Sequence, residues 1–179
     1  MKIRIMRLSL FLSFFYVLCP AWSDAPLSVV KKVDLKRYVG KWFEIASYPA
    51  WFQKGCTGTT AEYSLLSNGK IQVLNRCYKG SLDGQLKESK GKAEVVDTVT
   101  NAKLKVWFFW PFKGNYWIIE LDTDYQWAVV GEPSRKYLWI LSRTPIMEEA
   151  VYQGILQRLS QKGYDPEKLR KTVQATTNQ

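Results

Sequence analysis

Residues 33–47 read VDLKRYVGKWFEIAS, a short helical turn followed by a glycine and an aromatic-rich extended run. Asp34 stands where an N-cap side chain would hold the first turn of a helix. Gly40 allows a backbone conformation that is closed to other residues, and it directly precedes the expected first strand. Trp42, two positions later, is too large to be left on the surface. The stretch therefore predicts the start of a sheet whose first strand buries Trp42.

Two later segments could supply partners for Trp42: LDTDY at 121–125 and LWILSR at 138–143. Together the three segments resemble the lipocalins, and most closely the bacterial branch of that family. In lipocalins a Gly-x-Trp, a Thr-Asp-Tyr turn and an arginine after the last strand meet at the closed end of a barrel. The matching residues here are Gly40, Trp42, Thr123, Asp124, Tyr125 and Arg143. The resemblance runs from about Val33 to Val173.

This resemblance implies an all-β fold, an eight-stranded antiparallel up-and-down β-barrel at about residues 40–142 with one C-terminal α-helix packed outside. The residues support it independently, because eight short apolar runs follow one another with turn residues between them. Asn68-Gly69 is a strong hairpin signal between the second and third runs. The expected strands are 41–48, 59–65, 71–78, 86–96, 102–108, 115–121, 126–131 and 137–142.

A helix is predicted at about 145–162. Thr144 would be its N-cap and Pro145 its first residue, and Gly163 would end it. Apolar residues four apart form one stripe that would face the barrel: Met147, Val151, Ile155 and Leu159. Residues 172–174 are expected to add a short strand.

The first residues are predicted to be a signal peptide, 1–23, which leaves a single domain at 24–179. A positive start, an apolar run at 8–18 and Ala21-Trp22-Ser23 before Asp24 have the required order, and the apolar run is too short to span a bilayer. Export to the periplasm is expected. The alternative is a lipid anchor at Cys19 in the outer membrane, which is disfavoured because Leu18 before it is not small.

Cys56 and Cys77 are expected to form a disulfide in an oxidising compartment. A two-residue turn at Asn68-Gly69 would place Cys77 opposite Thr60, four positions from Cys56. The bond therefore requires the chain to fold back, which Gly55 and Gly58 could permit. The alternative is a free, nucleophilic Cys56.

The strand alternation places four connections at the open end of the barrel, where a small ligand would enter. Counting inward positions, together with the apolar runs, gives these barrel-lining candidates: Glu44, Ala46, Tyr48, Tyr63, Val73, Trp107, Phe109, Tyr116, Ile118 and Trp139. Such a wall suits an acyl chain better than a sugar or nucleotide, although each residue could equally be plain core. The expected mouth residues are Trp110, Phe112 and Lys113. Lys54, Lys79, Arg135 and Lys136 lie near them and could meet an anionic head group or remain solvated.

Composition excludes several classes of function. The chain has no histidine, which removes the commonest general base, the usual serine triad and most zinc sites. No second carboxylate is placed to work with Glu44, and no phosphate-binding loop is present. We therefore expect no enzyme, no cofactor and no metal. The net charge of +10 includes three cationic residues of the expected signal, so the mature chain would carry 23 basic and 16 acidic groups, or +7. Single lysines scattered between apolar strand residues favour an anionic lipid surface over nucleic acid.

The expected function is to bind a fatty acid or (lyso)phospholipid in the barrel, for lipid storage or transport. A role in envelope maintenance is implied by the resemblance alone. Two alternatives stay open: a cysteine-dependent enzyme that uses Cys56, and a membrane-surface or partner-binding protein whose barrel is filled by side chains. Peripheral membrane contact is compatible with the aromatic mouth, and the protein could be a monomer or a homodimer.

Overall fold

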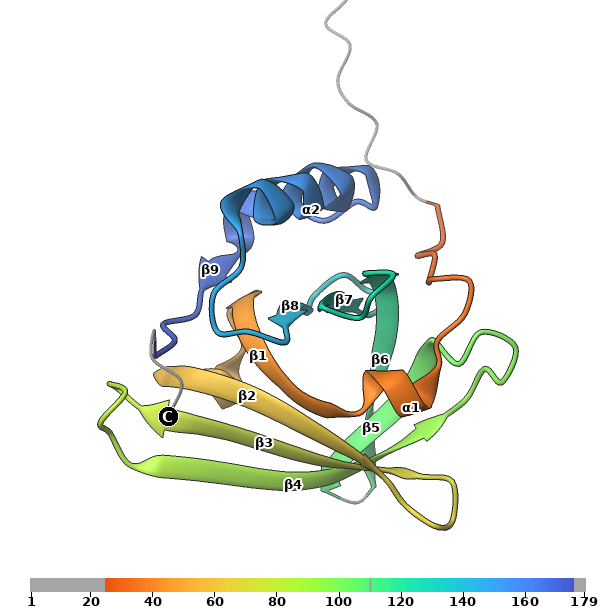
Figure 1. Cartoon of the computed structure of the whole chain (residues 1–179), viewed down its shortest axis with the longest axis horizontal. Coiled ribbons are helices and arrows are strands. Elements are labelled where there is room, and N and C mark those ends of the chain that lie inside the picture. The colour runs from red at the N-terminus through yellow and green to blue at the C-terminus, as the bar shows by residue number, and fades with distance from the viewer. Residues whose placement is uncertain (1–24, 110, 176–179) are drawn as a thin grey trace, which may run out of the picture.

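The computed structural model describes residues 25–109 and 111–175 and shows a closed antiparallel barrel with one long helix outside it (Figure 1). The predicted signal peptide, Cys19 and Trp110 lie outside the described residues. The strands follow one another around the barrel from β2 to β8, and β1 closes it by pairing with both β8 and β2. The predicted all-β barrel is confirmed.

The strand bounds agree with the predicted runs to within a few residues. The strands are β1 (Gly40–Ser47), β2 (Cys56–Leu65), β3 (Ile71–Lys79), β4 (Leu86–Val95), β5 (Lys103–Phe109), β6 (Phe112–Leu121), β7 (Trp127–Gly131), β8 (Leu138–Ser142) and a short β9 (Arg170–Lys171). The helices are α1 (Leu35–Tyr38), α2 (Glu149–Gln161) and the 3-10 turns η1 (Trp51–Gln53) and η2 (Pro166–Lys168).

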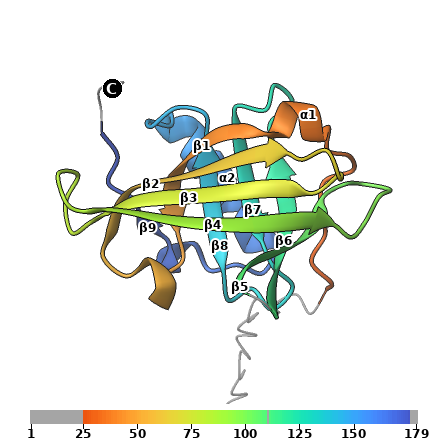
Figure 2. The same cartoon turned by 90° about the horizontal axis from the view of Figure 1, so that it is seen from below.

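Apolar residues form two clusters on opposite faces of the sheet. The inner cluster fills the closed half of the barrel around Trp42, which is fully buried. The outer cluster lies between the barrel and α2, where Ile155 and Leu159 pack against Ile140 of β8 and Val129 of β7. Strands β7 and β8 are therefore buried on both faces, whereas β4 lies on the side of the barrel away from α2 (Figures 1 and 2).

Helix α2 starts four residues later than Pro145, so the predicted start is wrong. The hydroxyl of Thr144 donates to the carbonyl of Ile146 at 2.7 Å, which holds a local turn in place of a helix cap. The predicted end is confirmed, because Gly163 follows the helix with a φ of +78°. Among the described helices, none has the length and apolar character needed to cross a bilayer.

The tail after α2 bridges β1 and β2 where these strands separate. β9 pairs with the end of β1 at residues 170–171, two residues before the predicted strand at 172–174. Beyond it, the Gly58 N–H donates to the Val173 carbonyl at 2.7 Å, and the Gln174 side chain donates to the carbonyls of Glu44 and Thr59. The C-terminal tail thus closes the gap in the barrel wall near the open end.

Candidate ligand-binding site

The pairing of the strands defines which side chains face the barrel interior. Tyr63 lies opposite Val73, and Leu104 lies opposite Tyr116, all within the inner cluster. Six of the predicted lining residues occupy inner positions: Glu44, Tyr63, Val73, Tyr116, Ile118 and Trp139. Their contact with a ligand stays a prediction. The predictions missed Val106 and Phe108, which also belong to the inner face.

Ala46 and Tyr48 do not line the barrel, and their prediction was wrong because β1 is irregular. A bulge between Glu44 and Ala46 changes the alternation, so that Ala46 lies opposite Ile140 in the outer cluster. Ser47 takes the inner place instead, opposite Trp139. Counting in twos from Trp42 therefore holds only as far as Glu44.

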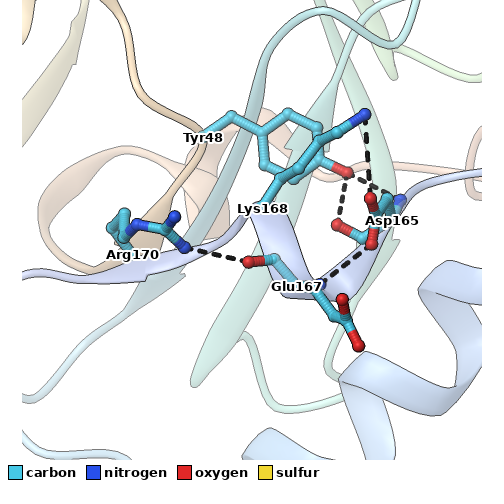
Figure 3. Close-up of polar contacts among 5 residues, drawn as sticks. All are labelled: Tyr48, Asp165, Glu167, Lys168 and Arg170. Atoms are coloured by element: carbon cyan, nitrogen blue, oxygen red, sulfur yellow. Dashed lines mark hydrogen bonds and ion pairs between the residues drawn. The ribbon is translucent and has the colours of Figure 1, made fainter.

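Tyr48 is fixed on the outside by the turn that follows α2 (Figure 3). Its hydroxyl donates to the Asp165 carbonyl at 2.8 Å and accepts the Asp165 N–H at 2.7 Å. The Asp165 carboxylate accepts the Glu167 N–H at 3.1 Å and lies 3.7 Å from the Lys168 ammonium, while Arg170 donates to the Glu167 carbonyl. These contacts set the course of the tail into β9.

Trp107 faces outward, so its prediction as a lining residue was also wrong. It lies opposite Lys92, and its ring centre is 4.7 Å from the ammonium of Lys113. Residues 103–106 alternate lysine with apolar residues, and this alternation, continued by one position, places Trp107 on the outer, lysine-bearing face. Phe109 belongs to β5, and its side chain is outside the described part of the structure.

Three tyrosines form a hydrogen-bonded chain inside the barrel. The hydroxyls of Tyr38 and Tyr116 are 2.7 Å apart, and Tyr116 donates to Tyr63 at 2.9 Å. Burial raises the pKa of Tyr63 to about 12 and that of the other two well above the ordinary value. All three therefore stay neutral at physiological pH and present hydroxyl groups within an apolar wall. Tyr38 was not predicted, because it lies in α1 before the first strand.

Glu44 connects four parts of the chain at the open half of the barrel. Its buried carboxylate accepts hydrogen bonds from Gln53 at 2.7 Å, Thr172 at 2.6 Å and Ser47 at 3.0 Å. The Gln53 oxygen in turn accepts the indole N–H of Trp139 at 2.9 Å. The carboxylate thereby holds η1 and the C-terminal tail against β1 and β8. Gln53 and Thr172 were not predicted, because they are ordinary polar residues of loops and carry no motif.

A cleft of about 500 Å³ lies beside this network, between the connection from β1 to β2 and the C-terminal tail. Glu44 and Ser47 lie at its inner side, and Lys54 and Arg170 contribute basic groups to its wall. Trp51 also lines the cleft and is 83% exposed. The open end thus carries a recess with an exposed aromatic edge.

At the closed end, Arg143 holds α1 against the first strand. Its guanidinium lies 3.7 Å from the centre of the Trp42 ring. It also donates to five backbone carbonyls, those of Arg37, Tyr38, Val39, Lys41 and Tyr125. Three of these belong to α1 or its C-cap, whose carbonyls lack partners within so short a helix. Gly40, which follows the C-cap of α1, has a φ of +97°, a backbone conformation that requires glycine.

The turn at 122–126 joins the same end of the barrel. The hydroxyl of Tyr125 accepts the Asp34 N–H at 2.9 Å, and the Thr123 carbonyl accepts a hydrogen bond from Arg37 at 3.1 Å. Within the turn, the Asp122 carboxylate accepts the N–H groups of residues 124 and 126. All three expected motifs therefore meet where the resemblance implied.

Residues 33–174 match the family model of the Lipocalin-like domain. The chain belongs to the lipocalin family. Temperature-induced lipocalin-1 of Arabidopsis thaliana is 43% identical over 159 residues, which cover 84% of each chain. Outer membrane lipoprotein Blc of Escherichia coli K12 is 43% identical over 142 residues, 79% of this chain and 80% of Blc. The structure of insecticyanin from Manduca sexta aligns with a TM-score of 0.67 at 23% identity, covering 86% of each chain, and supports the fold.

The predicted disulfide of this lipocalin is confirmed, with Cys56 and Cys77 joined and their Cα atoms 5.4 Å apart. The register differs by one residue from the predicted one, because Thr60 lies opposite Arg76. A bulge before Thr60, where Gly58 has a φ of +56°, supplies the bend that the bond requires. The bond consumes both thiols, which contradicts the alternative of a nucleophilic Cys56.

The predicted mouth residues of the lipocalin have different surroundings. Phe112 is 79% exposed, whereas Lys113 forms an ion pair with Glu94. Lys79 donates to the carbonyl of Lys54 at 3.0 Å, and Arg135 donates to the carbonyl of Lys162, the C-cap of α2, at 2.8 Å. Several of these cations thus serve to tie segments together. In the residues that the structure describes, no cluster of three acidic or cysteine side chains could hold a metal.

Proposed function

We propose that this lipocalin binds a single-chain lipid, a fatty acid or a lysophospholipid, in the open half of its barrel and stores or carries it. The observation that supports this most directly is the character of the incompletely buried inner face. Its apolar part is formed by Ala61, Val106, Phe108 and Trp139. The polar residues that share this face are Glu44, Ser47, Asn75 and Ser89. Lipocalins bind small hydrophobic ligands, and an acyl chain would gain most from such a wall.

The neutral tyrosine hydroxyls make the proposal more specific. Tyr63, whose hydroxyl accepts the proton of Tyr116, could donate its own proton to an oxygen of the ligand without requiring a buried charge. A nucleotide or sugar would instead need many polar partners within this wall, and each polar group left without one would weaken binding.

We further propose that the protein is exported. The disulfide supports this, because such bonds persist in oxidising compartments, and so does the similarity to a relative named as an outer membrane lipoprotein. Residues 1–23 would be the signal, and the periplasm the destination. Anchoring through Cys19 is the alternative, which mass spectrometry of the mature N-terminus would distinguish.

The test combines native mass spectrometry with lipid titration. A protein purified from the periplasm should carry an extractable acyl lipid, and the emptied protein should bind a fluorescent fatty acid. The Ala61→Trp variant, which fills the barrel interior, should weaken this binding at least tenfold. The matched control is Glu62→Trp. Position 62 is next to Ala61 on β2, but its side chain faces outward, so this variant should leave binding unchanged. Equal affinity in both variants, or no binding to the wild type, would refute the proposal.

A further inference from the structure

The outer face of β4, β5 and β6 concentrates lysines and two tryptophans, and we call it the lysine–tryptophan face. Alternation along the strands places these side chains outside the barrel, because the inner positions belong to residues such as Val106 and Tyr116. Lys92 lies opposite Trp107, and Lys103 lies opposite Trp117. The face comprises Lys70, Lys90, Lys92, Lys103, Lys105, Lys113, Trp107 and Trp117.

Lysines surround both indole rings of this face. The ammonium groups of Lys113 and Lys70 lie 4.7 and 5.4 Å from the centre of the Trp107 ring, and that of Lys103 lies 4.7 Å from the Trp117 ring. Both tryptophans remain partly exposed. Rings of this kind, flanked by cations, favour the region of a bilayer where head groups meet the acyl chains.

Acidic groups do little to neutralise the lysine–tryptophan face. Glu94 is paired with Lys113, and Glu88 is paired with Arg76. The ammonium groups of Lys92 and Lys105, by contrast, make no hydrogen bond or ion pair with any residue in 25–109 or 111–175, although Glu94 lies opposite Lys105 in the sheet. Helix α2 covers the other side of the barrel, as Figure 1 shows, and leaves the wall of β4 and β5 uncovered by the described chain. Trp117 packs against the outer cluster beneath α2, so it marks the border of the lysine–tryptophan face.

We propose that the lysine–tryptophan face docks the protein on the surface of an anionic lipid bilayer. Charge complementarity argues for this partner, because each lysine near such a surface contributes to binding. An aromatic ring lies among the cations, since the partly exposed indole of Trp107 contacts the ammonium groups of Lys113 and Lys70. An aromatic side chain of this kind gains from the bilayer interface, whereas nucleic acid backbone offers it no apolar partner.

Co-sedimentation with vesicles tests the proposal. The wild type should bind phosphatidylcholine vesicles that contain phosphatidylglycerol, should not bind vesicles of phosphatidylcholine alone, and should be released by high salt. Lys92→Glu combined with Lys105→Glu should weaken binding more than tenfold, because each lysine contributes about fivefold. The control is Lys162→Glu with Lys168→Glu, which changes the net charge equally on the side of α2 and should preserve binding within about twofold.

Two results would overturn the proposal. The first is equal loss of vesicle binding in both double variants, which would indicate an effect of net charge alone. The second is binding to a DNA duplex that is stronger than binding to anionic vesicles and is abolished by the same two substitutions. Unchanged near-UV circular dichroism and unchanged fatty-acid binding in the barrel serve as the check that each variant is folded.

Discussion

Replacing Arg143 with alanine should be among the most damaging single changes at the closed end. The guanidinium donates to five carbonyls that belong to three separate segments, and it covers the ring of Trp42. Alanine would leave these carbonyls without their partner and the ring without its cover. Lysine would keep the charge but could reach only a small part of this set, because it lacks the planar fork of donors.

The magnitude follows from the separate contacts. A hydrogen bond contributes about 1 kcal/mol net, and a cation–π contact about 1 kcal/mol at a partly buried site. Water can reach some of the exposed carbonyls after the substitution, which recovers part of the loss. The expected decrease in the free energy of unfolding for Arg143→Ala is therefore about 3–5 kcal/mol, with a somewhat smaller loss for Arg143→Lys.

Urea unfolding followed by far-UV circular dichroism, with the disulfide intact, measures this loss. Arg37→Ala is the matched control, because Arg37 belongs to the same end but donates one hydrogen bond, to Thr123, and lies over the exposed side of Tyr125. It should cost about 1 kcal/mol. A loss for Arg143→Ala no greater than that of the control would refute the view that this guanidinium joins α1 to the barrel.

The remaining predictions concern the open end. Replacing Cys56 and Cys77 with serine opens a loop whose ends are 21 residues apart, and it should reduce the free energy of unfolding by about 3 kcal/mol. Adding reductant should have no further effect on the stability of this variant. A loss below about 1 kcal/mol would contradict the prediction. Glu44→Gln should speed amide hydrogen exchange at residues 51–54 while leaving β3 and β4 unchanged, and unaltered exchange at 51–54 would argue against the network. Burial alone would raise the pKa of Glu132, but hydrogen bonds from its own turn lower the pKa overall. Its contribution to stability should therefore be complete above the unfolded-state pKa of about 4.3 and be lost as the pH falls through the lower folded pKa. Urea midpoints between neutral and acid pH should decline less steeply in Glu132→Gln, and equal slopes would contradict this.

The closed end could be predicted because three short motifs resemble those of the lipocalins, and the structure supplies a physical reason for each. Position 40 requires glycine because its φ is positive. Trp42 fills the interior at the closed end of the barrel, and Arg143 donates to a group of carbonyls that only a guanidinium can reach together. The strands could be predicted because the turns between them carry glycine, asparagine and proline. Their ends were less certain, as β6 shows by starting at Phe112 instead of Asn115.

The lining of the barrel could be predicted only where strands are regular. One bulge in β1 moved Ala46 and Tyr48 to the outside, and no residue in GKWFEIAS marks its position. Trp107 was assigned to the wrong face because its aromatic character suggested the interior, although the lysines at 103 and 105 share its face of β5. The partners of Glu44 illustrate a different limit, because Thr172 lies 128 residues away and nothing local connects the two.

The two ends of the barrel therefore differ in how they can move. The closed end joins α1, the turn at 122–126 and β8 through one guanidinium, and no part of it can open without losing several contacts together. At the open end, the segment between β1 and Cys56 is held by separate single contacts: the two hydrogen bonds of the Gln53 side chain, those that the carbonyls of Lys54 and Gly55 accept, and the contact of Phe52 with Tyr137. Breaking these contacts costs little free energy in comparison with opening the closed end. The disulfide meanwhile keeps the far end of the segment in place. A ligand that enters or leaves the barrel should therefore do so by displacing η1, and the exchange rate should rise in Gln53→Ala without loss of the closed-end structure.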